Sequence, residues 1–173
     1  EDVCGRAASV QKEIDFILER EELTHALYDL QQEGKLPLRV THNDTKLNNV
    51  MLDDKTGKGI CVIDLDTVMP GLAMNDFGDS IRFGASTALE DETDLTKVSC
   101  SMELFELYTK GFLKGCDGKL TAKEIELMPM GVCAAWPPER FLPAQEVLSR
   151  VPELRPAGRS GVAQLYRLPG AAG

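Results

Sequence analysis

Apolar and polar positions at the start of the chain follow the spacing of amphipathic helices. Over residues 6–33, apolar side chains recur three or four positions apart, which predicts helix. Charged side chains interrupt this stripe at residues 19–22, so we expect a kink or two abutting helices there. Gly34 is the expected C-cap. Residues 38–41 are short and favour a β-strand.

Two short apolar runs enclose a polar turn in the next part of the chain. Residues 50–52 and 60–63 are apolar, and residues 53–59 between them contain Asp, Lys, Thr and Gly. Two β-prone runs around a Gly-rich turn predict a β-hairpin. Residues 66–75 contain a Pro-Gly pair and are expected to form a loop.

Helical patterns return after this loop. A short helix is predicted to begin near Asp76, and a longer helix spans about residues 101–114. The inward side chains of the longer helix are expected to be Met102, Phe105, Tyr108 and Phe112. Thr121 and Glu124 have the spacing of a capping box, which predicts the start of a further helix. The predicted fold class is therefore α+β and mainly helical.

Composition changes after Gly131. Residues 132–173 hold six of the nine prolines and five Arg but neither Lys nor Asp, whereas residues 1–131 hold ten Lys and four Arg. We therefore predict a domain over residues 1–131 and a divergent Pro-, Arg- and Ala-rich tail over residues 132–173. The prolines disfavour a long helix there. The tail is interpreted as either disordered or translated out of frame, and we expect little function in it.

Charge and cysteine usage limit the partners and the compartment. A net charge of −9 makes nucleic acid an unsuitable partner, because phosphate backbones require basic surfaces. No apolar run reaches 18 residues, so we expect no membrane partner. The five cysteines form no C-x-x-C motif, and their odd number favours free thiols and a cytoplasmic location.

Polar residues with catalytic chemistry concentrate in residues 41–49, directly before the hairpin. Asp44 and Lys46 lie in this loop, and Asn49 lies where the loop enters the first strand. Asp64 ends the second strand, so the hairpin should return it beside Asn49. Two carboxylates and an amide oxygen would then meet around Lys46. Hard oxygens suit Mg²⁺, a Lys suits phosphate, and the set matches the requirements of phosphoryl transfer.

The order of these residues resembles a known family. The pattern His42-x-Asp44-x-x-x-x-Asn49, with Asp64 after a hairpin, is similar to the catalytic loop and metal-binding Asp of the aminoglycoside phosphotransferase/choline kinase family. Residues 36–85 carry the resemblance most clearly. It implies ATP-dependent phosphorylation of a hydroxyl on a small molecule.

The resemblance also implies a protein-kinase-like fold, of which residues 1–131 would form most of the mainly helical C-terminal lobe. The only G-x-G, residues 57–59, lies in the hairpin turn, and no Gly-rich loop or N-terminal β-lobe is recognisable. We therefore expect this chain to be inactive on its own.

Site roles follow from the same resemblance. Asp44 would be the catalytic base, Lys46 a phosphate contact, and Asn49 and Asp64 the ligands of Mg²⁺ that binds with ATP. Asp66 would assist with a second metal or a substrate hydroxyl, or it would only hold its own loop. The most similar members phosphorylate the anomeric hydroxyl of an N-acetylhexosamine, so an amino sugar is the expected substrate. Choline, an aminoglycoside or homoserine are the alternatives.

Other interpretations fit part of the pattern. Asp64-x-Asp66 after an apolar strand is also typical of D-x-D phosphatases and glycosyltransferases, although neither class explains the loop at residues 41–49. A third alternative is a non-catalytic remnant.

Four further residues receive structural interpretations. His42 is expected to pin the loop backbone. Asp76 begins an Asp-Phe-Gly triplet that resembles a metal-binding motif, but Asp64 has the hairpin geometry. Asp76 is therefore interpreted as an N-cap or structural carboxylate. Asp79 and Arg82 are spaced as an i, i+3 surface ion pair.

Overall fold

The computed structural model describes residues 2–18, 21–135 and 152–154, which fall into two compact units, one within residues 1–36 and one from residue 37 onward. The first unit contains the 3₁₀ turn η1 (Ala7–Val10) and the helices α1 (Gln11–Leu18) and α2 (Glu21–Gln32). The sequence predicted either one kinked helix or two helices over residues 6–33, and the structure has two. Gly34 ends α2 with a φ of +72°, a conformation that favours glycine at helix C-termini.

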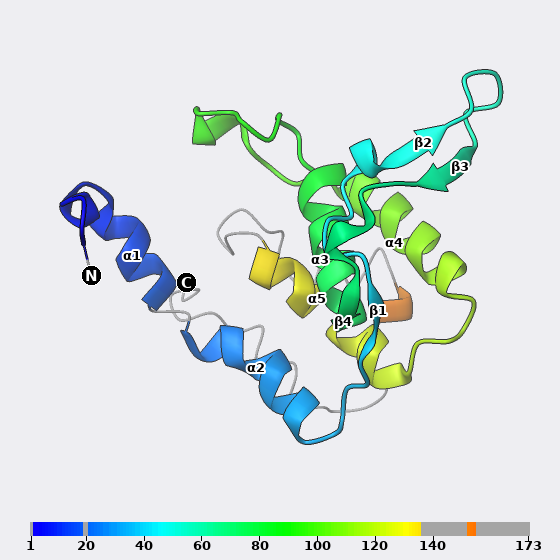
Figure 1. Ribbon diagram of the computed structural model, residues 1–173, viewed down its shortest axis with the longest axis horizontal. Coiled ribbons are helices and arrows are strands. Elements are labelled where there is room, and N and C mark those ends of the chain that lie inside the picture. Colours follow the sequence, from blue (N-terminus) through cyan, green and yellow to red (C-terminus); the bar gives the residue numbers. More distant parts are fainter. Residues whose placement is uncertain (1, 19–20, 136–151, 155–173) are drawn as a thin grey trace. The chain divides into compact units, whose positions relative to one another are not determined.

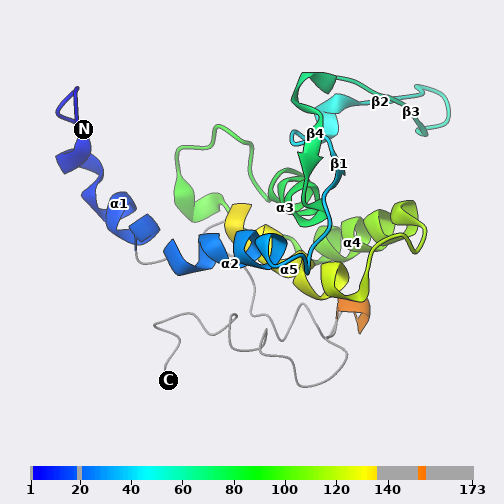
Figure 2. The same ribbon diagram turned by 60° about the horizontal axis from the view of Figure 1, so that its bottom comes forward.

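The second unit contains four short strands, three helices and several 3₁₀ turns among its described residues (Figures 1 and 2). In chain order these are β1 (Arg39–Thr41), η2 (Leu47–Asn49), β2 (Val50–Leu52), β3 (Gly59–Val62), η3 (Leu65–Thr67), β4 (Met69–Gly71), α3 (Ala73–Gly84), η4 (Leu95–Lys97), α4 (Met102–Cys116), α5 (Ala122–Ala135) and η6 (Pro152–Leu154). The predicted α+β class is confirmed.

Strand β4 corrects the sequence prediction of a loop over residues 66–75. It pairs antiparallel with β1, with Thr41 opposite Met69 and Arg39 opposite Gly71. The hydroxyl of Thr41 also donates to the carbonyl oxygen of Met69 at 2.9 Å. The partner strand lies about 30 residues earlier in the chain, so a local pattern that contains Pro70 cannot reveal the pairing. The pair fixes the end of β1 that leads directly into the loop at residues 41–49.

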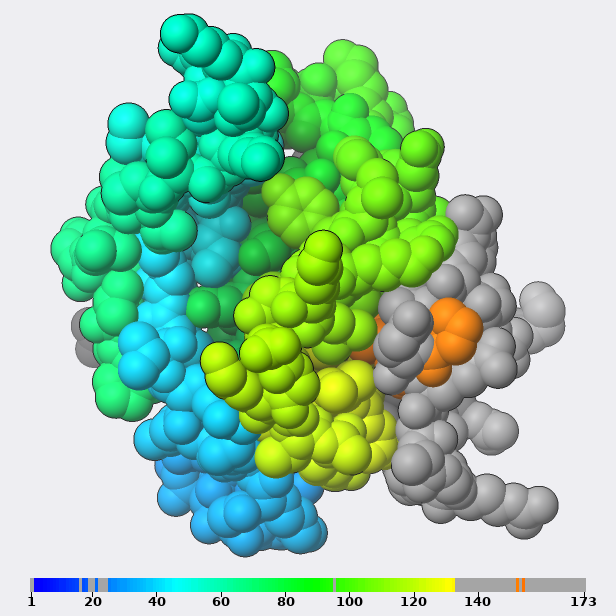
Figure 3. Space-filling model, turned by 90° about the vertical axis from the view of Figure 1, so that its right-hand side faces the viewer, coloured from blue at the N-terminus to red at the C-terminus, as the bar shows by residue number. Residues whose placement is uncertain are grey.

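Strands β2 and β3 form the predicted hairpin. Val50 pairs with Val62, and a register irregularity lies between Met51 and Leu52. The turn is organised by the Asp53 carboxylate, which accepts hydrogen bonds from the backbone and the hydroxyl of Thr56 at 2.8 and 2.7 Å. The hairpin, coloured cyan, projects at the upper edge of the face shown in Figure 3. It places residue 63 opposite the end of the loop at residues 41–49.

Helices α3 and α5 pack against each other at a glycine crossing. A Cβ on Gly131 would lie 2.7 Å from the carbonyl carbon of Met74, and closer still to its oxygen. A Cβ on Gly78 would lie 3.0 Å from the backbone nitrogen of Val132. Ordinary contact begins at 3.4 Å, so only glycine at these two positions allows the helix backbones to approach this closely.

The core joins α3, α4 and α5. Phe77 of α3 meets Phe105 and Phe112 of α4 edge to face, with ring centroids 6.1 and 5.3 Å apart. The predicted inward face of α4 is therefore confirmed. Helix α3 begins at Ala73, three residues before the predicted start. Helix α5 continues past residue 131 to Ala135, and Leu154 of η6 is fully buried in the same core.

An ion pair between the partly exposed Arg39 and the buried Glu124 ties β1 to the start of α5. The predicted capping box is confirmed, since the backbone N–H of Thr121 donates to Glu124 at 2.8 Å and the Glu124 N–H donates to the Thr121 hydroxyl at 3.2 Å. The guanidinium of Arg39 also donates to both oxygens of Glu124, at 2.9 and 2.7 Å.

Within the described part of the chain, no helix combines the length and apolarity needed to cross a membrane.

Candidate functional site

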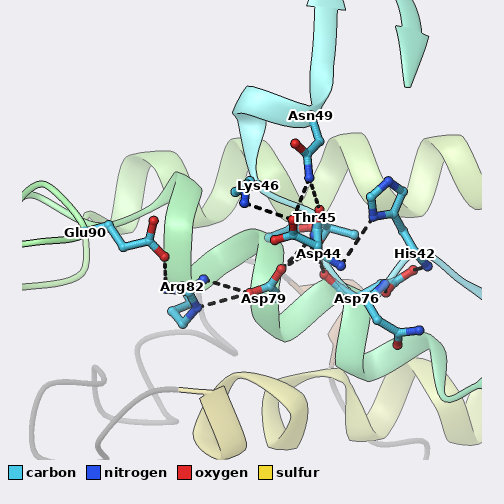
Figure 4. Close-up of polar contacts among 11 residues, drawn as sticks. His42, Asp44, Thr45, Lys46, Asn49, Asp76, Asp79, Arg82 and Glu90 are labelled. Carbon is cyan, nitrogen blue, oxygen red and sulfur yellow. Dashed lines mark hydrogen bonds and ion pairs between the residues drawn. The ribbon is translucent and has the colours of Figure 1, made fainter. Parts of the chain in front are cut away.

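The loop at residues 41–49 leaves β1 and is fixed to α3 through its backbone. The carboxylate of Asp76 accepts hydrogen bonds from the backbone N–H groups of His42 and Asn43, at 2.8 and 2.9 Å (Figure 4). Asn43 has a φ of +63°, and its side-chain amide donates to the carbonyl oxygen of Thr67 at 2.9 Å. Asp76 therefore acts as a structural carboxylate, one of its two predicted roles. It does not cap α3, whose N-cap position is Leu72.

A second carboxylate of α3 holds the next residue of the loop. Asp79 accepts from the backbone N–H of Thr45 at 2.7 Å and from its hydroxyl at 3.2 Å. The Thr45 hydroxyl also contacts the carbonyl oxygen of Asp76 at 2.8 Å. Asp76 and Asp79 lie one turn apart on α3, and together they bind the backbone N–H groups of His42, Asn43 and Thr45. The backbone on both sides of Asp44 is therefore held in place.

Asp44 lies at the centre of a compact polar group. Its Oδ2 accepts from the ammonium of Lys46 at 2.9 Å and from the amide of Asn49 at 2.8 Å. The hydrogen bond from Lys46, followed by that from Asn49, lowers the pKa of the Asp44 carboxyl below its ordinary value. Asp44 is therefore ionised at neutral pH, and about a quarter of its side chain is exposed to solvent.

Lys46 faces several carboxylates. Its pKa is raised chiefly by the hydrogen bond to Asp44 and by the charge of that carboxylate, and the charges of Asp64 and Glu90 raise it further. The Lys46 side chain is about one-third exposed. The raised pKa keeps Lys46 charged, and a partly exposed ammonium with three donors can contact a phosphate.

His42 links the loop to the hairpin. Its Nδ1 accepts a hydrogen bond from the backbone N–H of Asp44 at 3.3 Å, and its Nε2 lies 3.0 Å from the carbonyl oxygen of Ile63. Since a carbonyl oxygen can only accept, this pair of contacts requires the neutral ring with its proton on Nε2. The imidazole therefore pins backbone on both sides, as the sequence interpretation expected.

The hairpin returns Asp64 beside the end of the loop. The backbone N–H of Ile63 donates to the carbonyl oxygen of Asn49 at 2.9 Å, which extends the ladder of β2 and β3 by one pair. Asp64 follows directly in the left-handed conformation, with a φ of +61°, which Asp tolerates better than most residues. Asp66 lies two residues further in η3 and is exposed.

The donor set near the hairpin suits a hard divalent cation. The amide nitrogen of Asn49 is committed to Asp44, through contacts of 2.8 Å to its carbonyl oxygen and its carboxylate, which leaves the amide oxygen of Asn49 for a ligand. No group of three His, Cys, Asp or Glu side chains gathers into a metal site among residues 2–18, 21–135 and 152–154. Mg²⁺ needs only one or two protein oxygens when substrate phosphates and water complete its shell, and the oxygens of Asn49 and Asp64 are of the chemical type that this ion prefers.

The structure thus brings Lys46 and Asn49 into direct contact with Asp44 and places Asp64 directly after the last pair of the ladder, while Asp66 is exposed in η3. Sequence reasoning missed the anchoring role of Asp79, which it interpreted as half of a surface ion pair. The signal was present, because Asp76 and Asp79 put two carboxylates on one face of a helix whose neighbouring residues are buried.

Comparison with known proteins adds two findings. Residues 1–97, more than half of the chain, match the model of the phosphotransferase enzyme family (APH). A stretch of 59 residues is 42% identical to the GTP 3',8-cyclase of Alkaliphilus metalliredigens (strain QYMF), and it covers 33% of this chain and 18% of that protein. The chain spans less than a fifth of that relative. The family match includes every residue of the polar group described above.

Proposed function

Because the chain belongs to the phosphotransferase enzyme family, we propose that it serves the transfer of a phosphoryl group from Mg²⁺-ATP to a hydroxyl of a small molecule. The proposed acceptor is the anomeric hydroxyl of an N-acetylhexosamine, which rests on the resemblance of residues 36–85 to the kinases of such sugars. The same resemblance supports a kinase-like arrangement, with the second unit as part of the helical lobe. Family membership favours this function over the D-x-D phosphatase and glycosyltransferase alternatives.

One observation carries the proposal: an ionised Asp44 whose backbone is anchored on both sides. Two carboxylates of α3 hold the residues before and after it, at 2.7 to 2.9 Å. A base that must align a hydroxyl with a phosphorus atom gains most from such fixed geometry, since small misplacements reduce transfer strongly. Asn49 further restricts the carboxylate rotamer through its amide contact.

In the proposed mechanism, Asp44 accepts a hydrogen bond from the acceptor hydroxyl and orients its oxygen toward the phosphoryl group. The lowered pKa makes Asp44 a weak base, so it would take the proton only as the new O–P bond forms. The ammonium of Lys46 would stabilise the negative charge on the oxygens of the transferred phosphoryl group. Asn49 and Asp64 would hold Mg²⁺, which when bound neutralises phosphate charge.

The test is a turnover assay on a longer protein that contains this chain together with a nucleotide-binding lobe, because the chain is expected to be inactive on its own. Purified protein is incubated with Mg²⁺-ATP and, separately, an N-acetylhexosamine, choline, an aminoglycoside or homoserine, and the products are identified by ³¹P NMR. We expect ADP and a sugar 1-phosphate, with loss of turnover in Asp44→Asn. Asp117→Asn is the matched control, because it changes an exposed Asp at the left-handed C-cap of α4, a conformation that Asn also tolerates.

Each alternative has its own result. Phosphorylation of another alcohol would replace the proposed acceptor and keep the reaction. Release of free phosphate from a phosphomonoester without ATP would indicate a phosphatase. No transfer to any acceptor, by a protein whose circular dichroism shows an intact fold, would favour the non-catalytic remnant.

A further inference from the structure

Arg82 lies between two carboxylates that belong to different parts of the second unit. Its Nε donates a hydrogen bond to Oδ1 of Asp79 at 3.1 Å, and its terminal nitrogen Nη2 lies 3.0 Å from the same oxygen as an ion pair. The other terminal nitrogen, Nη1, donates to Glu90 at 3.1 Å. Glu90 belongs to the segment between α3 and α4, residues 85–101. Figure 4 shows Arg82 with Glu90 on one side and Asp79 on the other.

The Asp79 carboxylate passes this contact on to the loop that carries Asp44. One of its oxygens is held by Arg82, and the other accepts from the backbone N–H of Thr45 at 2.7 Å. Thr45 directly follows Asp44. An unbroken set of charged contacts therefore runs from Glu90 through Arg82 and Asp79 to the backbone next to the proposed base.

The contact between Asp79 and Arg82 is partly shielded from water, which makes it stronger than a typical surface pair, whereas the Glu90 side chain is 55% exposed. About a fifth of the Asp79 side chain and a third of the Arg82 side chain are exposed. Burial would lower the pKa of Arg82, but the hydrogen bonds to Glu90 and Asp79 raise it overall. Charge-assisted bonds with two acceptors suit the planar fork of Arg, and the single ammonium of a Lys cannot reproduce them.

The segment that carries Glu90 is itself closed at its base. The Thr87 hydroxyl donates to the carbonyl oxygen of Lys97 at 3.0 Å and accepts from the backbone N–H of Ser99 at 3.0 Å. The N–H of Ser101 donates to the carbonyl oxygen of Ala85 at 2.8 Å. These contacts join the two ends of the segment, and Arg82 contacts Glu90 between them.

We propose that Arg82 is a positioning residue for phosphoryl transfer: it holds Asp79 against Thr45 and is held in turn by Glu90, so that residues 85–101 help to set the pose of Asp44. The proposal rests on the proposed function, since it assigns Asp44 the role of the base. It gives the Asp79–Arg82 pair a task beyond that of the surface contact which the sequence suggested.

The first test measures the loop directly. Hydrogen exchange of the Thr45 amide is followed by NMR in the wild type and in Arg82→Ala, Arg82→Lys and Glu90→Gln. Without Arg82, the Asp79 carboxylate should no longer be held against the Thr45 N–H, and this hydrogen bond should weaken. Exchange of the Thr45 amide should therefore become about tenfold faster or more in Arg82→Ala, and rise less in the other two variants. Lys97→Gln is the matched control, because it removes ion pairs with Glu92 and Asp94 in the same segment without touching Arg82.

The second test separates positioning from stability. In Arg82→Ala, kcat should fall about 10- to 100-fold while KM for ATP stays unchanged, and Arg82→Lys should recover part of the loss. A double-mutant cycle of Glu90→Gln with Asp79→Asn should show coupling in kcat, and this coupling should vanish when both changes are made in Arg82→Ala. A purely structural role would lower the unfolding midpoint without this coupling.

The two proposals fail separately. Unchanged Thr45 exchange in Arg82→Ala, or an equal effect in Lys97→Gln, would overturn the role of Arg82 even in an active enzyme. If the wild type transfers no phosphate, the proposed function fails, while the exchange measurement still decides whether Arg82 holds the loop.

Discussion

The glycine crossing of α3 and α5 allows a sharp prediction about stability. Replacing Gly131 by Ala places a methyl group against the backbone of Met74, at 2.7 Å from its carbonyl carbon, where ordinary contact begins at 3.4 Å. The obstacle is main chain within a helix, so no side-chain rotation can relieve it. The two helices must therefore separate at this crossing.

The magnitude follows from two opposing terms. Overpacking in a core costs about 1–3 kcal/mol and sometimes more, and a rigid backbone obstacle lies at the upper end. Ala gains up to about 1 kcal/mol over Gly in helix propensity. We therefore expect Gly131→Ala to lower the free energy of unfolding by about 2 kcal/mol, or the midpoint of thermal unfolding by about 4–8 °C.

Gly111→Ala provides the control within the same unit. Gly111 lies in α4, is exposed, and a Cβ there would meet nothing within 4 Å. Only the propensity term acts, so this variant should gain about 0.5–1 kcal/mol. Urea unfolding followed by circular dichroism measures both variants. If Gly131→Ala is as stable as the wild type, or if both variants shift in the same direction, the close approach of the two helices is refuted.

Three further predictions concern the site and its support. Asp44→Asn should reduce kcat by at least about 10²-fold in a steady-state assay, and near-normal turnover would contradict a base at this position. Asp64→Ala should weaken Mg²⁺-ATP binding measured by calorimetry, and unaltered affinity would remove Asp64 from the metal site. Burial would raise the pKa of Glu124, but hydrogen bonds from Arg39 and Thr121 outweigh it and lower the pKa. This carboxylate therefore stabilises the fold above its unfolded pKa of about 4.5, and the contribution disappears as pH falls through the lower folded value. In Glu124→Gln, the free energy of unfolding should fall less steeply as the pH decreases. An unchanged pH dependence would show that the Arg39–Glu124 ion pair does not stabilise the fold.

The sequence predicted those elements of the fold that depend on residues close together in the chain. The apolar face of α4, the capping box at Thr121 and the hairpin at residues 50–63 depend on residues a few positions apart, and all three are present. Strand β4 depends on a partner that precedes it by about 30 residues, and Pro70 concealed it. Long-range pairing of this kind leaves no periodic signal in the sequence.

The same distinction holds for the site. The loop and hairpin place Asp44, Lys46 and Asn49 together through short-range connections, which the sequence could indicate. The contact of Asp79 with Thr45 joins residues that are 34 positions apart, and the contact of Arg82 with Glu90 depends on the irregular segment after α3, so neither has a periodic signal in the sequence. The roles of the predicted site residues in catalysis and metal binding stay predictions until the variants above are measured.

The two-stranded ribbon of β2 and β3 has a consequence for the proposed binding of a nucleotide. Its apolar residues Met51, Leu52, Ile60 and Val62 are about half exposed or more, and an isolated pair of strands is only marginally stable in water. Transient fraying of the ribbon would carry Asp64 away from Asn49, and apparent affinity falls in proportion to the fraction of molecules that are competent to bind. An ion held by Asn49 and Asp64 would therefore oppose this fraying, and slower amide exchange across residues 50–62 would report its binding before any chemistry takes place.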